Sequence, residues 1–206
     1  MTQPIPNRQG VAGAALPRAD SSLANRQLLL IEHGQTRFDR RHRVHGFLDP
    51  PLNPEGRRQA ARLGLRLAGL AHPPSRIFTS DRRRAAETAR IAGAIAGIPV
   101  TATPALRPLN VGRFSGQDQR AVARRLQPYF AEPERRIPGG ESVGTWRRRH
   151  LAFVRGLAAA ARGAAERPAL LTHSNVIESL GGGAHPRSAQ MLRVSFPSPG
   201  FQNSSS

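Results

Sequence analysis

Three polar side chains of this sequence, each shortly after an apolar run, could together carry out chemistry on an anion: His33, Arg84 and His173. Two imidazoles and a guanidinium offer hydrogen bonds and positive charge to a phosphate-like group. Neutral imidazole is also a good nucleophile toward phosphorus, while a second histidine and an arginine can hold the oxygens of the transferring group. Each residue alone is more simply explained as structural, but the three together favour a phosphoryl-transfer site.

The elements that must position these residues are short strands alternating with helices. Continuous apolar runs predict strands at Gln27–Ile31, Arg76–Ser80, Pro99–Thr103, Ala169–Thr172 and Met191–Phe196. Apolar residues at helical spacing predict helices at Pro54–Leu70, Arg83–Ile95, Glu141–Ala165 and from Val176 to Leu180. This alternation indicates a mainly parallel sheet covered by helices on both faces. Ligands of such sheets bind beyond the carboxyl ends of the strands, so the three polar side chains are expected to converge there.

We expect one domain over residues 26–196, because 206 residues are enough for one full-sized core. Residues 1–25 are rich in Pro, Gly, Asn and Ser and show no periodicity. They are interpreted as a flexible N-terminal tail, and residues 197–206 as a polar C-terminal tail.

The basic composition does not by itself indicate a nucleic-acid partner. The formal net charge is +18, but lysine is absent, and the arginines are spread along the chain without interleaved aromatic residues. We therefore expect no specific binding to nucleic acid. Cysteine is also absent, which excludes disulfides and a thiolate nucleophile. No apolar run approaches the roughly 20 residues that span a bilayer, so the expectation is a cytoplasmic protein without a membrane partner.

Five segments form an ordered series of motifs: EHGQTRFDRRHRVHGFLDPPLNPEGRRQA, FTSDRRRAAETA, LRPLNVGRFSG, PGGES and THSNVI. They cover about residues 28–180 and resemble the motifs of the histidine phosphatase superfamily, the phosphoglycerate mutase-like proteins. Within the first segment the matches to the family's Arg-His-Gly-Glu-Thr and Gly-x-x-Asp-x-Pro-Leu signatures include His33, Gly34, Thr36, Gly46, Asp49, Pro51, Leu52, Gly56, Gln59 and Ala60.

The resemblance implies a three-layer α/β/α sandwich and a phosphohistidine intermediate. By it, His33 is the residue that becomes phosphorylated, and Arg84 and His173 hold the phosphoryl group. No metal and no other cofactor is expected, since the family works through the histidine itself. Further contacts to substrate are expected from Arg37, Asp39, Gly46, Ser174 and Asn175.

The sequence also departs from the family pattern at two positions that bear on chemistry. Glu32 stands where an arginine usually precedes the nucleophile, and Pro108 stands at the position of the usual general acid. Two unit charges about 4 Å apart interact by roughly 4 kcal/mol at an effective dielectric of about 20, so an ionised Glu32 would weaken phosphate binding. We expect Glu32 to pair with Arg84 or a protonated histidine and so to occupy the phosphate site. Proline has no proton to donate, and losing a general acid typically costs about 10² to 10⁴ in rate.

Two milder departures are Asp39, at the position of an asparagine, and Ser174, at the position of a glycine. Glu141 or Asp118 is a possible substitute acid, although Glu141 is more simply explained as ordering its own loop. Compensating charge could come from the arginines that follow His33, namely Arg37, Arg40, Arg41 and Arg43.

The resulting expectation is a phosphomonoester phosphatase of weak activity that acts on a small phosphorylated substrate or a phosphoprotein. The alternative is a catalytically impaired family member that binds phosphorylated or other anionic ligands, and a phosphoglycerate mutase is less favoured. Substrate identity is not readable, because specificity is expected to lie in loops such as Gly112–Arg136. The sequence does not predict an oligomeric state.

Overall fold

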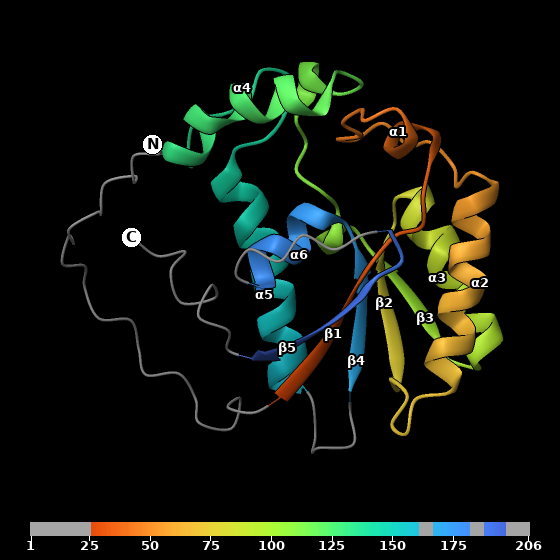
Figure 1. The fold of residues 1–206 in the computed structure, drawn as a ribbon. Coiled ribbons are helices and arrows are strands. Elements are labelled where there is room, and N and C mark those ends of the chain that lie inside the picture. The colour runs from red at the N-terminus through yellow and green to blue at the C-terminus, as the bar shows by residue number, and fades with distance from the viewer. Residues whose placement is uncertain (1–25, 161–166, 182–187, 197–206) are drawn as a thin grey trace, which may run out of the picture.

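A computed structural model describes residues 26–160, 167–181 and 188–196 (Figure 1). The two predicted tails, residues 1–25 and 197–206, lie outside the described residues. Within the described part of the chain, no helix is long and apolar enough to cross a membrane.

The centre of the fold is a five-stranded sheet with the strand order β3-β2-β4-β1-β5. Its strands are β1 (Arg26–Glu32), β2 (Arg76–Ser80), β3 (Val100–Thr103), β4 (Pro168–Thr172) and β5 (Met191–Phe196). The first four in this order pair in parallel, and β5 pairs with β1 in the antiparallel sense. The predicted mainly parallel sheet is therefore confirmed, with an antiparallel strand at one edge.

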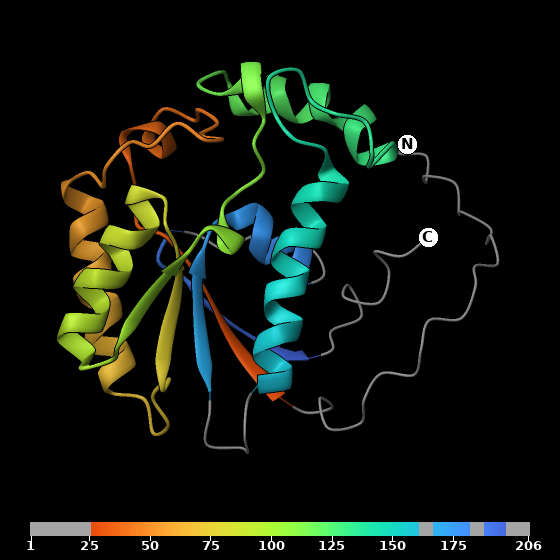
Figure 2. The ribbon, with the colours of Figure 1, turned by 180° about the vertical axis from the view of Figure 1, so that it is seen from behind.

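Helices cover both faces of the sheet, which gives the expected three-layer sandwich (Figure 2). On one side lie α2 (Pro54–Ala68) and α3 (Arg83–Ala96), and on the other lie α5 (Val143–Ala160) and α6 (Ser174–Gly181). Successive strand residues point to opposite faces, and so Leu30 belongs to the core beneath α5 and α6 while Ile31 belongs to the core beneath α2 and α3. Strands buried on both faces explain why their sequences read as continuous apolar runs.

The structure corrects the prediction for Gly112–Arg136, which was treated as loop. This segment contains a 3₁₀ turn, η3 (Gly112–Phe114), and the 13-residue helix α4 (Gln119–Ala131). Two other short elements, α1 (Arg37–Arg40) and the 3₁₀ turn η2 (Pro104–Leu106), were also not predicted. Helix α4 lies beyond the carboxyl ends of the strands, as Figures 1 and 2 show from opposite sides.

The helix predicted to begin at Glu141 begins instead at Val143. The hydroxyl of Ser142 accepts a hydrogen bond from the backbone N–H of Thr145 at 3.1 Å, which caps the first turn and fixes the start of the helix. Glu141 itself is held outside the helix, because its carboxylate accepts the backbone N–H of Asn110 at 2.8 Å. The predicted end at Ala165 falls in residues 161–166, which lie outside the described residues.

Candidate active site

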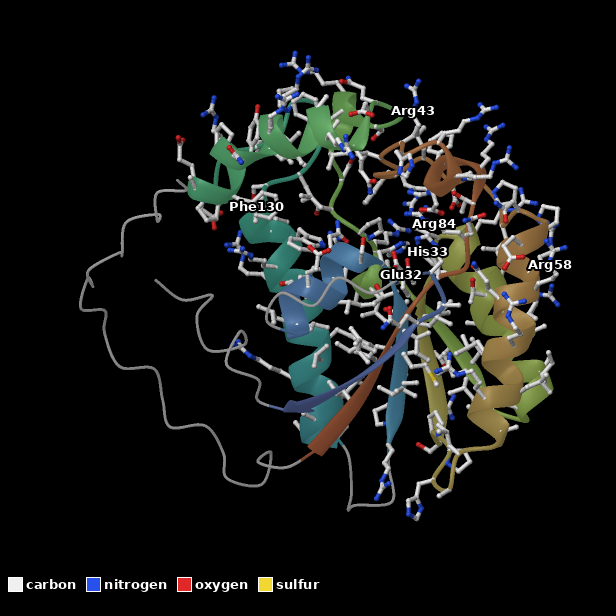
Figure 3. The ribbon with its side chains drawn as sticks, in the orientation of Figure 1. Glu32, His33, Arg43, Arg58, Arg84 and Phe130 are labelled. Atoms are coloured by element: carbon white, nitrogen blue, oxygen red, sulfur yellow. The ribbon has the colours of Figure 1, made fainter. Side chains whose placement is uncertain are left out.

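A pocket of about 340 Å³ opens at the carboxyl ends of β1 and β4. Its polar end gathers side chains that are far apart in the sequence: Glu32, His33, Asp39, His45, Arg84, His173, Ser174 and Asn175. Figure 3 shows Glu32, His33 and Arg84 close together in the middle of the molecule. The predicted convergence of His33, Arg84 and His173 in one pocket is therefore seen in the structure.

The two ring nitrogens of His33 have different partners, and these partners fix the tautomer. Nδ1 lies 2.8 Å from the carbonyl oxygen of Gly34, which can accept a hydrogen bond but cannot donate one. Nε2 lies 3.2 Å from Nε of Arg84, which donates and cannot accept. The proton of neutral His33 is therefore on Nδ1, and Nε2 keeps its lone pair. Burial, together with the positive charge of Arg84, lowers the pKa of His33 to about 4, so the ring is neutral at pH 7.

Arg84 lies in the first turn of α3 and is 1% exposed. Besides its contact with His33, it donates a hydrogen bond from Nη1 to the carbonyl oxygen of Leu48 at 3.1 Å, and Nη1 lies 3.8 Å from a carboxylate oxygen of Asp49. Burial lowers the pKa of Arg84 to about 10, which still leaves the guanidinium charged at pH 7. A buried cation beside the His33 ring can therefore stabilise negative charge on a phosphoryl group.

His173 follows β4 and is buried against His33, with the ring centroids 5.2 Å apart. Neither of its ring nitrogens has a hydrogen-bond partner within the described part of the chain. Burial and the charge of Arg84 lower its pKa well below the ordinary value, so the ring is neutral. A buried, unpartnered imidazole in a pocket has donor and acceptor capacity that a bound ligand can satisfy.

The backbone that carries His33 is fixed by contacts to two helices. The backbone N–H of Gly34 donates to the hydroxyl of Thr88 at 2.9 Å, and that hydroxyl donates to the carbonyl oxygen of Arg84 at 2.7 Å. Gly34 also lies so close to α2 that an added Cβ would stand 2.6 Å from the carbonyl oxygen of Gly56. These contacts tie the loop after β1 to the helix that carries Arg84, which sets the distance between the His33 ring and the Arg84 guanidinium.

Glu32 lines the same pocket and is 8% exposed. The prediction that it pairs with Arg84 or a histidine is not met, because no ion pair of Glu32 is formed with any described residue. A hydrogen bond from the backbone of Ser174 reaches its carboxyl group instead. Burial, reinforced by the nearby charges of Asp39 and Glu178, raises the pKa of Glu32 to about 8. At pH 7 the carboxyl group is therefore mostly protonated, and the expected charge repulsion toward phosphate is largely absent.

His45 is a pocket residue that the sequence reasoning missed. Its ring centroid lies 5.6 Å from that of His33, and its Nε2 lies 2.7 Å from the hydroxyl of Thr36. Thr36 and Asp39 form a capping box at the start of α1, and this box holds Asp39 next to His45. The sequence could have indicated His45, because it directly precedes Gly46, where the Gly-x-x-Asp-x-Pro-Leu signature begins.

The residues expected to contact substrate divide into two groups. Asp39, Gly46, Ser174 and Asn175 line the pocket. Arg37 does not line it: this side chain is exposed and its guanidinium lies 5.5 Å from the ring centroid of Phe38. The first turn of α1 directs Arg37 away from the pocket because the capping box turns Asp39 inward.

Of the three positions considered for a general acid, only the one occupied by proline lies in the pocket. Pro108 is buried and lines the pocket. Glu141 does not line it, and its carboxylate is bound to Arg149 at 2.5 Å as well as to the backbone of Asn110. Asp118 is exposed and caps α4 by accepting the backbone N–H of Ala121 at 3.0 Å. Both carboxylates thus have structural partners outside the pocket.

Comparison with known proteins shows the family. A model of the histidine phosphatase superfamily (branch 1) matches residues 28–196. The chain belongs to this superfamily. The match takes in His33, Arg84 and His173, and the family predicted from the motifs is confirmed.

Two curated relatives of this chain carry phosphoglycerate mutase names. "Phosphoglycerate mutase-like protein 4" of Arabidopsis thaliana is 31% identical over 175 residues, which cover 82% of this chain and 75% of that protein. "Probable phosphoglycerate mutase GpmB" of Klebsiella pneumoniae is 34% identical over 124 residues, which cover 57% of this chain and 56% of that protein. The match therefore spans little more than half the length of the Klebsiella protein.

Solved structures share the fold. A phosphoglycerate mutase from Thermus thermophilus has a TM-score of 0.66 and 30% identity, with 83% of this chain and 94% of that chain covered. A mycobacterial glucosyl-3-phosphoglycerate phosphatase, solved with VO3, has a TM-score of 0.66 and 26% identity, with 82% and 92% covered. Relatives of this chain thus include proteins named as mutases and as phosphatases.

Proposed function

We propose that this histidine phosphatase hydrolyses phosphomonoesters through a phosphohistidine at His33. The observation that carries the proposal is the pair of hydrogen bonds that puts the ring proton on Nδ1 and leaves the lone pair of Nε2 beside Arg84. A nucleophilic imidazole needs a free lone pair at the attacking nitrogen and a nearby cation for the transferring group. His33 meets both requirements at neutral pH.

In the first step, Nε2 of His33 attacks phosphorus, an N–P bond forms, and the P–O bond to the leaving group breaks. As Nε2 engages phosphorus, Nε of Arg84 is released from it and can donate to a phosphoryl oxygen. His173, which has no partner among the described residues, can donate a second hydrogen bond. The positive charge that develops on the His33 ring is stabilised by the Nδ1–H bond to the Gly34 carbonyl oxygen.

In the second step, a water oxygen attacks phosphorus, the N–P bond breaks, and its electron pair returns to Nε2. Orthophosphate leaves, and the water proton passes to solvent or to the departing phosphate. His33 then regains the starting tautomer, since Gly34 keeps the proton on Nδ1 throughout.

The leaving oxygen has no proton donor at Pro108, and neither Glu141 nor Asp118 lines the pocket. Among the described lining residues, protonated Glu32 is the remaining carboxyl group that could give the leaving oxygen a proton, and without such a transfer departure relies on the stability of the leaving anion. A missing general acid typically costs about 10² to 10⁴ in rate, and the cost falls when the leaving group is a weak base. We therefore expect slow turnover overall, with phenolate-type leaving groups favoured over alkoxides.

A catalytically impaired protein that binds a small phosphorylated ligand or a phosphoprotein is the second candidate. Pro108 favours it, because binding needs Arg84 and His173 but no proton donor. Protonated Glu32 is compatible with either candidate, since it offers a hydroxyl rather than a negative charge to a phosphate oxygen.

Hydrolysis of 4-nitrophenyl phosphate and of an alkyl phosphate by four proteins tests the proposal: the natural chain, His33→Ala, Pro108→Glu and Glu32→Arg. We expect slow hydrolysis by the natural chain, none by His33→Ala, and a gain of about 10²-fold or more for Pro108→Glu with alkyl phosphates. Equal rates for the natural chain and His33→Ala would refute the proposal. Calorimetric binding of orthophosphate without hydrolysis by any of the proteins would support the binding candidate instead.

A further inference from the structure

The pocket has an apolar half that the phosphoryl chemistry does not use. Its large apolar lining residues come from the loops after α1 and η2 and from helix α4: Val44, Leu109, Val111, Val122, Leu126 and Phe130. Leu109, Val111 and Val122 are buried, whereas Phe130 is 40% exposed. Figure 3 shows Phe130 below the ribbon of α4, with Arg58 on the opposite side of His33. A large exposed aromatic ring at a pocket wall is a surface that a bound apolar group can cover.

Helix α4 presents one face to this half of the pocket. Each pocket residue of α4 lies three or four positions from another one, as residues on one side of a helix do: Gln119, Val122, Ala123, Leu126 and Phe130. The arginines of the same helix, Arg120, Arg124 and Arg125, are exposed and are not among the lining residues. The sequence of α4 thus puts four apolar side chains and the uncharged Gln119 toward the pocket, and its charge toward solvent.

The charge of the lining is unusual for so basic a chain. Although the formal net charge is +18, Arg84 is the one arginine among the described residues that line the pocket. Arg43, labelled beside α4 in Figure 3, is not a lining residue either. Its guanidinium donates a hydrogen bond to the carbonyl oxygen of Gly116 at 2.9 Å. Arg147, whose guanidinium lies 5.9 Å from the centroid of the Phe130 ring, is likewise not a lining residue. A second anionic group on a ligand would therefore meet no lining cation in the apolar half and would lose part of its hydration there.

We infer that the apolar half is a subsite for the organic part of the substrate, and that this part is an uncharged aryl or alkyl group. The inference rests on the proposed function, because it takes the end of the pocket at His33 and Arg84 as the phosphate site. It assigns this chain to monoesters with one anionic group, in contrast to substrates that carry a carboxylate beside the phosphate. Leu126 and Phe130 are then the residues that determine specificity.

Binding of phosphonates tests the subsite without requiring turnover. The probes are orthophosphate, methylphosphonate, butylphosphonate and 4-phosphonobutanoate, titrated calorimetrically into the natural chain at pH 6.5. Burial of three additional methylenes is expected to make butylphosphonate bind about 10- to 60-fold more tightly than methylphosphonate. 4-Phosphonobutanoate, whose chain ends in a carboxylate, is expected to lose this gain.

Two variants localise the effect. Phe130→Arg places a cation at an exposed position of the wall, so folding should be preserved, and it should reverse the preference in favour of 4-phosphonobutanoate. Leu65→Arg makes the same change at a residue of α2 that is 66% exposed and does not line the pocket, and it should leave all affinities unchanged.

The outcomes separate this inference from the proposed function. Equal affinities for methyl- and butylphosphonate, or tighter binding of 4-phosphonobutanoate by the natural chain, would overturn the apolar subsite and leave the phosphate site standing. Failure of orthophosphate and of every phosphonate to bind would overturn the phosphate site, and the subsite with it. A gain with chain length that Phe130→Arg abolishes and Leu65→Arg retains would establish the subsite.

Discussion

Replacing Glu32 with glutamine should stabilise the protein, and the gain should grow with pH. The ordinary pKa of the carboxyl group is 4.5, and the folded protein raises it to about 8. Between these values the folded state keeps a proton that the unfolded state has already lost. The stability contributed by the neutral carboxyl group is therefore fully present below pH 4.5 and is lost as pH rises through 8.

The size of the effect follows from the two pKa values. Each pH unit between them is worth about 1.4 kcal/mol, which gives about 5 kcal/mol in total and about 3 kcal/mol between pH 5 and pH 8. Glutamine keeps an oxygen that can accept the backbone hydrogen bond of Ser174, but it has no charge to bury. The buried histidines weaken the folded state in acid, because burial lowers their pKa values, but they do so in both proteins and cancel in the comparison.

The assay is urea unfolding of the natural chain and of Glu32→Gln at pH 5, 6, 7 and 8. We expect the difference in unfolding free energy to move by about 3 kcal/mol in favour of the variant over this range. Glu132→Gln removes a carboxylate that is 63% exposed and serves as the control, with a difference that stays nearly constant. A Glu32→Gln difference that is flat from pH 5 to pH 8 would refute the argument that burial keeps Glu32 protonated.

Three further outcomes follow from the same structure. The affinity of the natural chain for orthophosphate should fall as pH rises through about 8, because Glu32 then becomes charged, and the affinity of Glu32→Gln should not show this fall. Calorimetric affinities that change with pH equally in the two proteins would contradict this. Gly34→Ala should lower the free energy of unfolding by about 1 to 3 kcal/mol and slow hydrolysis, because its Cβ would stand 2.6 Å from the Gly56 carbonyl oxygen. The control Gly156→Ala, in α5 with open space around it, should instead raise the free energy of unfolding by about 0.5 to 1 kcal/mol. Ser142→Ala should cost about 1 kcal/mol by removing the cap of α5, and an unchanged unfolding midpoint would refute the cap assignment.

The sheet and the packing helices were predictable because their sequences carry strong patterns. Strand β1 is a continuous apolar run, and both of its faces are buried, with Leu30 and Ile31 each fully enclosed. The place of His33 follows from the same run, since the strand ends just before it. Local pattern and tertiary burial agree at these positions, which is why the sequence alone suffices there.

Helix α4 was missed because its apolar face is narrow and interrupted. Val122 and Leu126 are four positions apart, but arginines fill much of the rest of the helix, and Pro128 lies inside it. Proline removes one backbone donor, so it normally signals the end of a helix. The helix buries Val122 and Tyr129 in the core and gives only part of its surface to it, so it lacks the broad apolar face by which core helices are predicted.

The state of Glu32 could not be read from the sequence because a pKa depends on burial and on neighbours that are distant along the chain. The sequence places an acid beside His33, and an exposed acid there would be charged. In the folded protein the desolvation of Glu32 and the proximity of Asp39 keep it protonated near neutral pH. Arg37 shows the reverse case, since its type and spacing suit phosphate but the turn that contains it directs it to solvent.

The central claim is that Nε2 of His33 carries the phosphoryl group. Its most direct test is to incubate the natural chain with a small phosphodonor such as phosphoramidate, quench in alkali, and locate the modified peptide by mass spectrometry. The account predicts one acid-labile phosphate on the peptide containing His33, absent from His33→Ala and present in the control Leu65→Ala. Turnover by the natural chain with the phosphate on another residue, or turnover that survives in His33→Ala, would contradict it.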